Sequence, residues 1–459
     1  MPAHPSVRLL AAMIAASALS STGPAHAGGF ALREQGVSGL GNAYAGAAAV
    51  AEDASTIFYN PAGMARLRGN QILGGATYVA PDLRFTNTSS RVRDSSTSLL
   101  TGSNGGDAGQ DSVVPHGYAM WDVSPDLKLG IGITSPFGLI TSYDDDWVGR
   151  YHAITSKVAT RNIQPTVSYR VNPGLSVGAG LQAQQIDTTL TKAIDFAGLC
   201  TGNFSDFACS ILAFSRPRDD GHLRLTGDSW GYGFTLGVLY EPSPSTRIGL
   251  GFRSKVEHTL KGEADFTVQG LGNLLTVGTN LYQDTSAKAD ITTPESLSLS
   301  IVHELNARWS LLGDVTWTNW SRFKELRFRY GNGQQPDTVM PQNWKDSYYV
   351  AVGATYKPDE TWVYRFVIAY DQSATRDADR SALQPDNDRL RVSLGASYAL
   401  TPALTLNIGY AHIFVAESSI DSRSASLPNI RGFTPLFHRL IGSYDNHVDM
   451  LGIGASLKF

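Results

Sequence analysis

The sequence is poor in the residues that build metal centres, nucleic-acid interfaces and cofactor sites. It holds two cysteines among 459 residues, and its net charge of −4 comes from acidic and basic residues that are interspersed along the chain. Two thiols without a neighbouring histidine are poor zinc ligands, and the cations form no stripe of the kind that follows a phosphate backbone. We therefore expect no metal, no nucleic-acid partner and no cofactor.

Signs of a catalytic site are weak as well. His303-Glu304 lacks the second histidine of a zinc-protease motif, and Asp144-Asp145-Asp146 lacks the spacing of a calcium loop, which favours a solvated loop. Serine and histidine residues are too scattered to indicate a catalytic triad. We do not expect an enzyme.

The one marked apolar run lies near the start of the chain. Arg8, the run Leu9–Leu19 and the A-x-A triplet Ala25-His26-Ala27 form the pattern of a secretory signal peptide, so residues 1–27 are expected to be removed and the mature chain to begin at Gly28. A membrane anchor is the alternative, but a spanning helix needs roughly 20 apolar residues, more than this run offers.

Beyond Gly28 no run is long enough for a transmembrane helix, and the mean hydropathy is near neutral. Two classes remain: a secreted globular protein, or a membrane barrel whose alternating apolar and polar residues average out. The 46 glycines, 19 tyrosines and 18 phenylalanines favour a large sheet with aromatic girdles. Export also implies an oxidising compartment, where Cys200 and Cys209 are expected to form a loop-closing disulfide.

Period-two alternation recurs along the chain and predicts strands with one apolar and one polar face. Clear examples are 127–134, 234–240, 296–301 and 390–398. Six short turns carry proline, glycine or asparagine: 124–126, 172–174, 241–244, 305–307, 357–359 and 401–403. Seven long polar segments alternate with them: 86–111, 137–156, 191–221, 263–284, 329–342, 373–387 and 417–444. Short periplasmic turns and long extracellular loops predict an all-β, antiparallel transmembrane barrel of about fourteen strands in the Gram-negative outer membrane.

The final strand favours closure of that barrel. Leu451, Ile453, Ala455 and Leu457 alternate up to the terminal Phe459, an ending that resembles the signature by which barrels are handed to the outer-membrane assembly machinery. An ordinary edge strand is the alternative. A β-sandwich would leave this apolar edge exposed, whereas a closed barrel has no edge.

The segment ahead of the first strand does not alternate. Residues 28–69 are rich in alanine and glycine and are too few for an independent domain. A barrel of about fourteen strands would otherwise hold an open channel, so we expect this segment to plug the lumen of a barrel formed by residues 70–459.

Several motifs resemble those of the long-chain fatty acid transporter family of outer-membrane proteins, which includes the toluene and xylene channel proteins. They are Gly28-Gly29-Phe30, Gly39–Gly46, Glu52–Ser55, Asn60-Pro61-Ala62-Gly63, Trp147–Tyr151, Trp317–Ser321 and the closing strand. The resemblance implies a fourteen-stranded monomer plugged by an N-terminal hatch that includes Phe30, Asn60, Pro61 and Ala62. It also implies passive uptake, in which loops capture the ligand, an internal pocket holds it, the hatch rearranges, and the ligand leaves sideways where the third strand kinks.

A candidate for that side opening is Pro136-Phe137-Gly138, at the end of the third strand. Proline removes a ladder hydrogen bond and glycine permits a sharp bend, so this triplet can interrupt the wall. The alternative is that Pro136 simply ends the strand at a loop.

Apolar residues stand out in the third and fourth long segments, which are otherwise polar, and exposed apolar clusters usually contact something apolar. We expect a capture groove built from Phe204, Phe207, Ile211, Leu212, Phe214, Leu271, Leu274 and Leu275, with Phe196 and Leu199 beside them. Packing of the two loops on each other, stapled by the cysteines, is the alternative, and both interpretations can hold together.

A fatty acid also needs a cation for its carboxylate, because a buried unpaired charge is costly. The resemblance places Arg327 at a carboxylate-binding position of the family. Lys192, expected beyond the fifth strand, is a weaker match because the spacing there shifts. The alternative is that both are ordinary lumen or rim charges.

These observations favour a passive channel for hydrophobic small molecules, with long-chain fatty acids first and monoaromatic hydrocarbons second. A general porin and a surface adhesin or phage receptor are further alternatives. The expected partners are the ligand, the assembly machinery, and outer-membrane lipid and lipopolysaccharide.

Overall fold

The computed structural model describes residues 28–92, 99–203, 209, 211, 215–276, 281–425 and 436–459. The predicted signal peptide lies outside the described residues. None of the described helices is long and apolar enough to cross a membrane.

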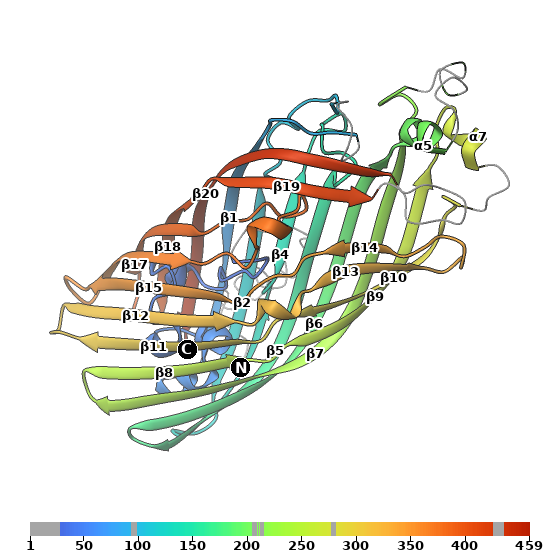
Figure 1. Cartoon of the computed structure of the whole chain (residues 1–459). Coiled ribbons are helices and arrows are strands. Elements are labelled where there is room, and N and C mark those ends of the chain that lie inside the picture. The colour runs from blue at the N-terminus through green and yellow to red at the C-terminus, as the bar shows by residue number, and fades with distance from the viewer. Residues whose placement is uncertain are drawn as a thin grey trace.

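Antiparallel strands form one closed sheet (Figure 1). They are β1 Gln71–Asn87, β2 Ser112–Asp122, β3 Leu127–Thr134, β4 Gly138–Ser142, β5 Thr155–Asn172, β6 Leu175–Ile194, β7 Gly221–Ser243, β8 Thr246–Arg253, β9 Val256–Thr267, β10 Thr285–Thr293, β11 Ser296–Glu304, β12 Trp309–Thr318, β13 Glu325–Tyr330, β14 Thr338–Pro341, β15 Ser347–Tyr356, β16 Trp362–Asp371, β17 Arg389–Ala399, β18 Leu404–Val415, β19 Ser418–Ala425 and β20 Phe437–Lys458. The first and last strands pair from Gln71↔Lys458 to Asn87↔Gly442, which closes the barrel.

The barrel has fourteen strands, as the alternation and turns predict. Six of them are interrupted along their length: β3/β4, β8/β9, β10/β11, β12/β13, β14/β15 and β18/β19. All six predicted short turns connect neighbouring strands at one end of the barrel. At the other end lie the long connections, so this end is extracellular.

Alternation along each strand separates a lipid face from a lumen face. On β7, Phe234, Leu236 and Val238 are exposed on the outer surface, whereas Leu223, Leu225 and Leu239 are buried. Aromatic residues bracket the outer apolar stretch, with Trp230 and Tyr232 at one end and Tyr240 at the other. This is the pattern of an apolar belt between two interfacial girdles.

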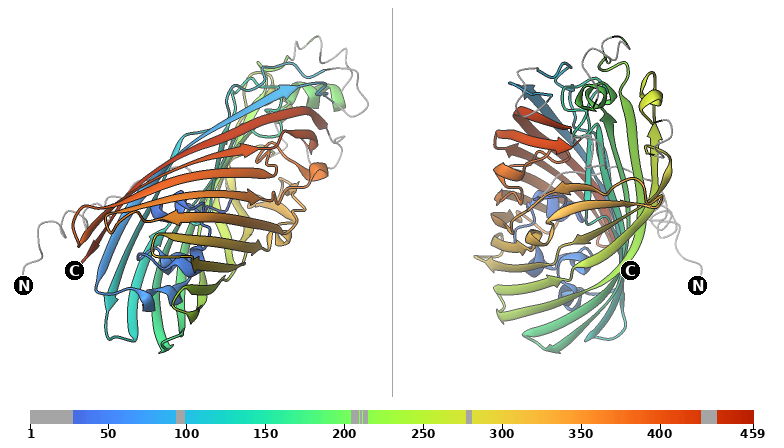
Figure 2. Two further views of the ribbon diagram at one scale, coloured as in Figure 1. Left: turned by 90° about the vertical axis from the view of Figure 1, so that its left-hand side faces the viewer. Right: turned by 45° about the vertical axis from the view of Figure 1, so that its right-hand side comes forward.

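The N-terminal segment lies inside the barrel, where Figure 2 shows its short helices in blue. It contains α2 Val37–Gly41, α3 Ala47–Val50, α4 Thr56–Tyr59 and the 3-10 turn η1 Pro61–Arg66. α2 packs on β17, β18 and β20, α3 on β8 and β11, and η1 on β5, β6 and β7. The segment therefore plugs the lumen as expected, and its boundary falls between Arg66 and the start of β1.

Further short helices among the described residues are α5 Phe196–Asn203, α7 Gly272–Thr276 and η3 Asp377–Asp379 in the long connections, and η2 Trp320–Arg322 in the interruption between β12 and β13. Two of the connections differ from the sequence prediction. Most of 417–444 is strand, because β19 pairs with the long extracellular end of β20. Segment 373–387 folds back into the lumen instead of remaining outside, and Ala374, Ala382 and Gln384 are buried there.

Gly227-Asp228-Ser229-Trp230-Gly231 has the spacing of a nucleophile elbow. It lies within the continuous ladder of β6 and β7, where Ser229 pairs with Ile186. A nucleophile elbow requires a sharp turn from a strand into a helix, so this stretch is an ordinary strand.

Candidate functional site

An apolar cavity of about 600 Å³ lies inside the extracellular half of the barrel. We call it the apolar chamber. Its apolar lining residues are Phe30, Leu139, Val158, Leu190, Leu225, Leu260, Ile291, Phe323, Leu326, Phe328, Trp344 and Leu383.

A more polar cavity of about 650 Å³ adjoins it and shares Gln342 and Leu383 with it. This polar chamber is lined by Lys192, His152, Arg423 and Asp337, among other residues. Burial, together with repulsion from His438 and Lys192, lowers the pKa of His152 to about 3. His152 is therefore neutral near pH 7, and the cations of the chamber are Lys192 and Arg423.

The structure separates the two predicted carboxylate partners. Lys192 is buried inside β6, near its extracellular end, and not beyond the strand as its weaker motif match suggests. Arg327 lies on the outer face of the β13–β14 hairpin and pairs with Glu325 (2.7 Å) and Asp337 (3.2 Å). Its neighbours Leu326 and Phe328 point into the apolar chamber. Arg327 therefore lines neither chamber, although its partner Asp337 lines the polar one.

Most of the predicted capture groove cannot be placed. Phe204, Phe207, Leu212 and Phe214, and the side chains of Leu274 and Leu275, lie outside the described residues. Ile211 is 66% exposed, and Leu271 is partly exposed.

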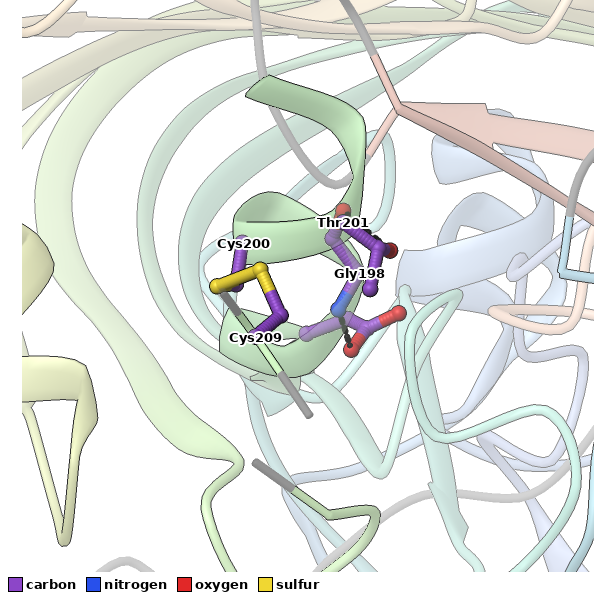
Figure 3. Close-up of a disulfide and its surroundings, with 5 residues drawn as sticks. Gly198, Cys200, Thr201 and Cys209 are labelled. Atoms are coloured by element: carbon purple, nitrogen blue, oxygen red, sulfur yellow. Dashed lines mark hydrogen bonds between the residues drawn. A yellow bond between two sulfur atoms is a disulfide. The ribbon is translucent and has the colours of Figure 1, made fainter. Parts of the chain in front are cut away.

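The inner residues of the third loop pack against the fourth. Phe196 and Leu199 are buried, and the Phe196 ring lies 5.3 Å from that of Tyr282. Cys200 and Cys209 form a disulfide beside α5 (Figure 3). This part of the two loops thus has its own small core.

A buried ionic network joins the third loop to the barrel wall. The Asp195 carboxylate accepts hydrogen bonds from the Gly198 backbone (2.7 Å), from Arg216 Nε (2.8 Å) and from His438 Nε2 (2.9 Å). Burial alone would raise the pKa of Asp195, but the hydrogen bond from His438 and the charge of Arg216 bring it to about 2. One carboxylate therefore fixes the start of α5, the returning loop and β20.

His152 lies in the connection formed by residues 143–154, which we call the extracellular lid, and makes its stability sensitive to acid. The pKa of His152 is about 3 when the lid is closed and 6.5 when the side chain is exposed to water. Between pH 3 and pH 6.5, His152 therefore binds a proton in the open lid but not in the closed one. The stabilisation by neutral His152 is complete above pH 6.5 and is lost as the pH falls toward 3. We expect the protection of residues 143–154 against hydrogen exchange, expressed relative to the intrinsic exchange rate at each pH, to decrease below pH 6.5, and His152→Asn to remove most of this pH dependence. An unchanged pH dependence in the variant would contradict this assignment.

The third barrel strand is interrupted at 135–137, as proposed from Pro136. β3 pairs with β2 up to Ile133↔Gly117 and with β5 up to Thr134↔Asn162. After the interruption, β4 continues along β5 from Gly138↔Ala159, and its ladder with β2 is not resumed among the described residues. The wall therefore has a break between β2 and β4.

The first described residues of the chain fill this break. Phe30 accepts a hydrogen bond from the Gly138 backbone (2.7 Å), and the Leu32 backbone donates to the Pro136 carbonyl (2.8 Å). We call residues 28–32 the latch. The Gly28 nitrogen donates to Asp371 Oδ2 (2.9 Å), which ties the latch to β16 on another part of the wall.

The Phe30 ring is held in an aromatic box. Its ring centre lies 4.7 Å from that of Trp320, 5.8 Å from Trp344 and 5.9 Å from both Phe137 and Phe323. Phe30 therefore contacts both the apolar chamber and the strand break. The sequence identified Phe30 and Phe137 separately but did not predict that they meet.

Asn60 joins the parts of the plug to the wall. Its side-chain amide donates to the carbonyls of Ala48 (2.6 Å) and Val238 (2.9 Å), and its oxygen accepts from the Ala62 backbone (3.0 Å). Pro61 follows at the first position of η1, where its missing N–H costs nothing. The Asn60-Pro61-Ala62 motif is thus an anchor point of the plug.

A third cavity, of about 820 Å³, lies between the latch, the plug and the barrel wall. Arg33, Phe58, Arg253, Pro136 and Phe137 are among its lining residues. We call it the lower chamber. It adjoins the break in the third strand, and the sequence did not predict it, because its wall comes from residues far apart in the chain.

The chain matches a family model over residues 18–459, that of the outer membrane protein transport protein (OMPP1/FadL/TodX). It is 30% identical to the putative outer membrane protein NMB0088 of Neisseria meningitidis serogroup B, over 95% of each chain. It is 28% identical to the long-chain fatty acid transport protein of Escherichia coli O6:H1, over 88% of this chain and 90% of that one.

Solved structures share the architecture. A Pseudomonas aeruginosa FadL homologue superposes with a TM-score of 0.82 at 26% identity, covering 94% of this chain and all of that one. The Ralstonia pickettii toluene transporter TbuX gives 0.62 at 20% identity, covering 91% and 98%, which shows the fold alone. The chain therefore belongs to the OMPP1/FadL/TodX family of outer membrane transport proteins, which are channels for hydrophobic substrates.

Proposed function

We propose that this channel takes up long-chain fatty acids. The observation that carries the proposal is the junction of the apolar chamber with a polar chamber that contains buried Lys192. An acyl chain fits the first and a carboxylate fits the second, so the pair matches an amphiphile with one anionic end. The name of the Escherichia coli relative supports the same ligand class.

Lys192 is the residue to which we assign the carboxylate. It lines the polar chamber, whereas Arg327 lies on the outer face of the β13–β14 hairpin and lines neither chamber. A charge-assisted hydrogen bond in a buried site is worth about 1.5–3 kcal/mol.

Release takes place through the break in the third strand. A fatty acid that crossed an aqueous pore would expose its chain at a cost of roughly 25 cal/mol per Å², whereas a sideways exit keeps it in contact with apolar groups. The lower chamber leads to Pro136 and Phe137, and the latch closes the break until it moves. After cleavage at the predicted site the Gly28 nitrogen is a terminal ammonium group, and its contact with Asp371 becomes an ion pair.

Capture begins at the third and fourth loops. Ile211 is exposed and Leu271 is partly exposed, as a capture groove requires. We also assign the other residues of the predicted groove to ligand capture. The buried core formed by Phe196 and the disulfide would hold the groove in shape.

Monoaromatic hydrocarbons are the second candidate ligands. The apolar chamber would accept a small aromatic ring, and Phe30, Trp344 and Phe328 supply aromatic contacts. A hydrocarbon has no carboxylate to pair with Lys192, so the effect of replacing Lys192 distinguishes the two candidate ligands.

Replacing Lys192 by methionine keeps most of the stem and removes the charge. If oleate is the ligand, we expect its affinity to fall roughly 10-fold to 100-fold, in line with the loss of one charge-assisted hydrogen bond, while toluene binding changes less than about twofold. The measurement is equilibrium binding of labelled oleate and toluene to the purified protein, followed by uptake into proteoliposomes. Arg327→Met is the matched control and should leave oleate binding unchanged. Equal oleate affinity in wild type and Lys192→Met would contradict the assignment of Lys192 as the partner of the ligand carboxylate.

A general porin and an adhesin or phage receptor are the remaining alternatives. A plugged lumen does not favour the porin, and steady ion conductance in a planar bilayer would favour it. We further propose a monomer that contacts outer-membrane lipid and lipopolysaccharide through its outer face and depends on the barrel assembly machinery.

A further inference from the structure

The connection between β16 and β17 is folded into the lumen and pinned to the wall. We call residues 372–388 the strap. Thr141 Oγ1 donates to the Leu383 carbonyl (3.2 Å), Tyr143 Oη to the Ala382 carbonyl (3.0 Å), and Asn446 Nδ2 to the Pro385 carbonyl (3.1 Å). Two parts of the barrel, the end of β4 and β20, therefore hold Ala382, Leu383 and Pro385 of the strap in one position.

The same strap residues form part of the walls of the ligand chambers. Ser381 and Ala382 line the polar chamber, Leu383 lines both chambers, and Gln384 lines the apolar chamber. Gln384 is 4% exposed and is one of six polar residues that line the apolar chamber, the others being Ser156, Lys157, Thr188, Thr189 and Gln342. A ligand that fills the two chambers therefore contacts residues 381–384 of the strap.

The strap also holds the latch. Gln384 Nε2 donates a hydrogen bond to the Gly29 carbonyl, between the Gly28–Asp371 contact and the Phe30 box. Asp371 immediately precedes the strap, and Arg389, which immediately follows it, lies 3.6 Å from Asp371 and pairs with Asp386. One side chain, Gln384, therefore touches both the chamber that would hold the ligand and the segment that closes the exit.

We propose that the strap couples ligand binding to opening of the latch, with Gln384 as the positioning residue. This inference rests on the proposed function. An acyl chain in the apolar chamber competes for space with the Gln384 side chain, which forms part of the wall, and so favours a conformation in which this side chain has moved out of the chamber. The Gly29 carbonyl then loses its donor, and residues 30–32 can separate from Pro136 and Gly138. The ligand shifts the equilibrium because it binds better when the amide has left.

The test follows access to the latch. Ala31 lies in the latch, pairs with Phe137 and lines the lower chamber, and the two native cysteines are joined to each other. A single Ala31→Cys substitution therefore introduces one thiol for labelling with a water-soluble maleimide. In this background, we expect saturating oleate to accelerate labelling at least tenfold. With Gln384→Leu added, labelling should already be fast without oleate, and oleate should change it less than twofold.

Gln71→Leu is the matched control. Gln71 is a buried glutamine on β1 that lines none of the three chambers. It should retain the tenfold response. Gln384→Asn, which shortens the side chain by one methylene, is the second variant in case Gln384→Leu does not fold, and it should behave as Gln384→Leu does. Heat-modifiable gel migration reports folding of each variant.

The outcomes separate this inference from the proposed function. Slow basal labelling and a full oleate response in Gln384→Leu or Gln384→Asn would overturn the coupling and leave uptake standing. The coupling would also be overturned if oleate entered proteoliposomes but did not accelerate maleimide labelling of the Ala31→Cys protein. If oleate neither enters proteoliposomes nor changes labelling, the proposed function itself fails.

Discussion

Deleting Ser135, Pro136 and Phe137 should abolish fatty acid uptake while oleate still binds. Without these residues β3 runs directly into β4, and Gly138 moves from opposite Ala159 to opposite Arg161. A register shift of two residues keeps every side chain on its original face, so the strand can pair continuously. The exit is then closed, and we expect uptake into proteoliposomes to fall at least 100-fold.

The control for this deletion keeps the interruption. Pro136→Ala retains three residues between β3 and β4, and uptake should stay within about threefold of wild type. Oleate binding should be preserved in both proteins, since the polar chamber and most of the apolar chamber are untouched. Uptake at the wild-type rate in the deletion variant would show that ligand leaves by another route.

Gly249→Val should turn the closed barrel into a steady ion conductor. Gly249 lies on β8 under the plug, and a Cβ built there would lie 1.9 Å from the carbonyl oxygen of Ala48. This oxygen belongs to the backbone and cannot rotate away, so a branched side chain forces α3 off the wall. The hydrogen bond from the Asn60 amide to the Ala48 carbonyl and the one from the Ala48 backbone nitrogen to Ser300 Oγ are then broken. A lumen of fourteen strands without its plug is wide enough to hold water.

The measurement is single-channel conductance in a planar bilayer. Wild type should show little steady current, and Gly249→Val a stable open level. Gly313→Val is the matched control, because Gly313 is on β12, where the nearest side-chain contact of a Cβ is Ile301 at 3.2 Å and the plug is not involved. A closed Gly249→Val channel would mean that the plug does not seal the lumen through this contact.

Much of the fold could be read from the sequence because a barrel repeats one local rule. Alternation such as Leu127 to Ile133 and turns such as Asn172-Pro173-Gly174 are properties of neighbouring residues, and they predicted the strand number and the turns. Two features outside the membrane were less predictable: where the third loop begins, and the pairing of β19 with β20. Polar residues in 417–444 are compatible with either a loop or a strand outside the membrane, since neither face there needs to be apolar.

The site was only partly predictable for a related reason. The alternation of Leu326 and Phe328 with Glu325 and Arg327 already indicates that Arg327 faces away from the apolar side, and this signal could have been used. The inward course of the strap had no comparable signal. Its polar residues Arg380, Gln384 and Asp386 are buried because the lumen supplies partners from distant strands.

The route of the ligand is the central claim, and photocrosslinking during uptake tests it directly. A fatty acid with a diazirine near its methyl end is added to proteoliposomes, irradiated, and its adducts are mapped by mass spectrometry. We predict adducts in the apolar chamber, at Leu190 and Leu326, and at the break, from Pro136 to Gly138. Adducts on the periplasmic side of the plug, around Glu52, with none at the break, would contradict lateral exit.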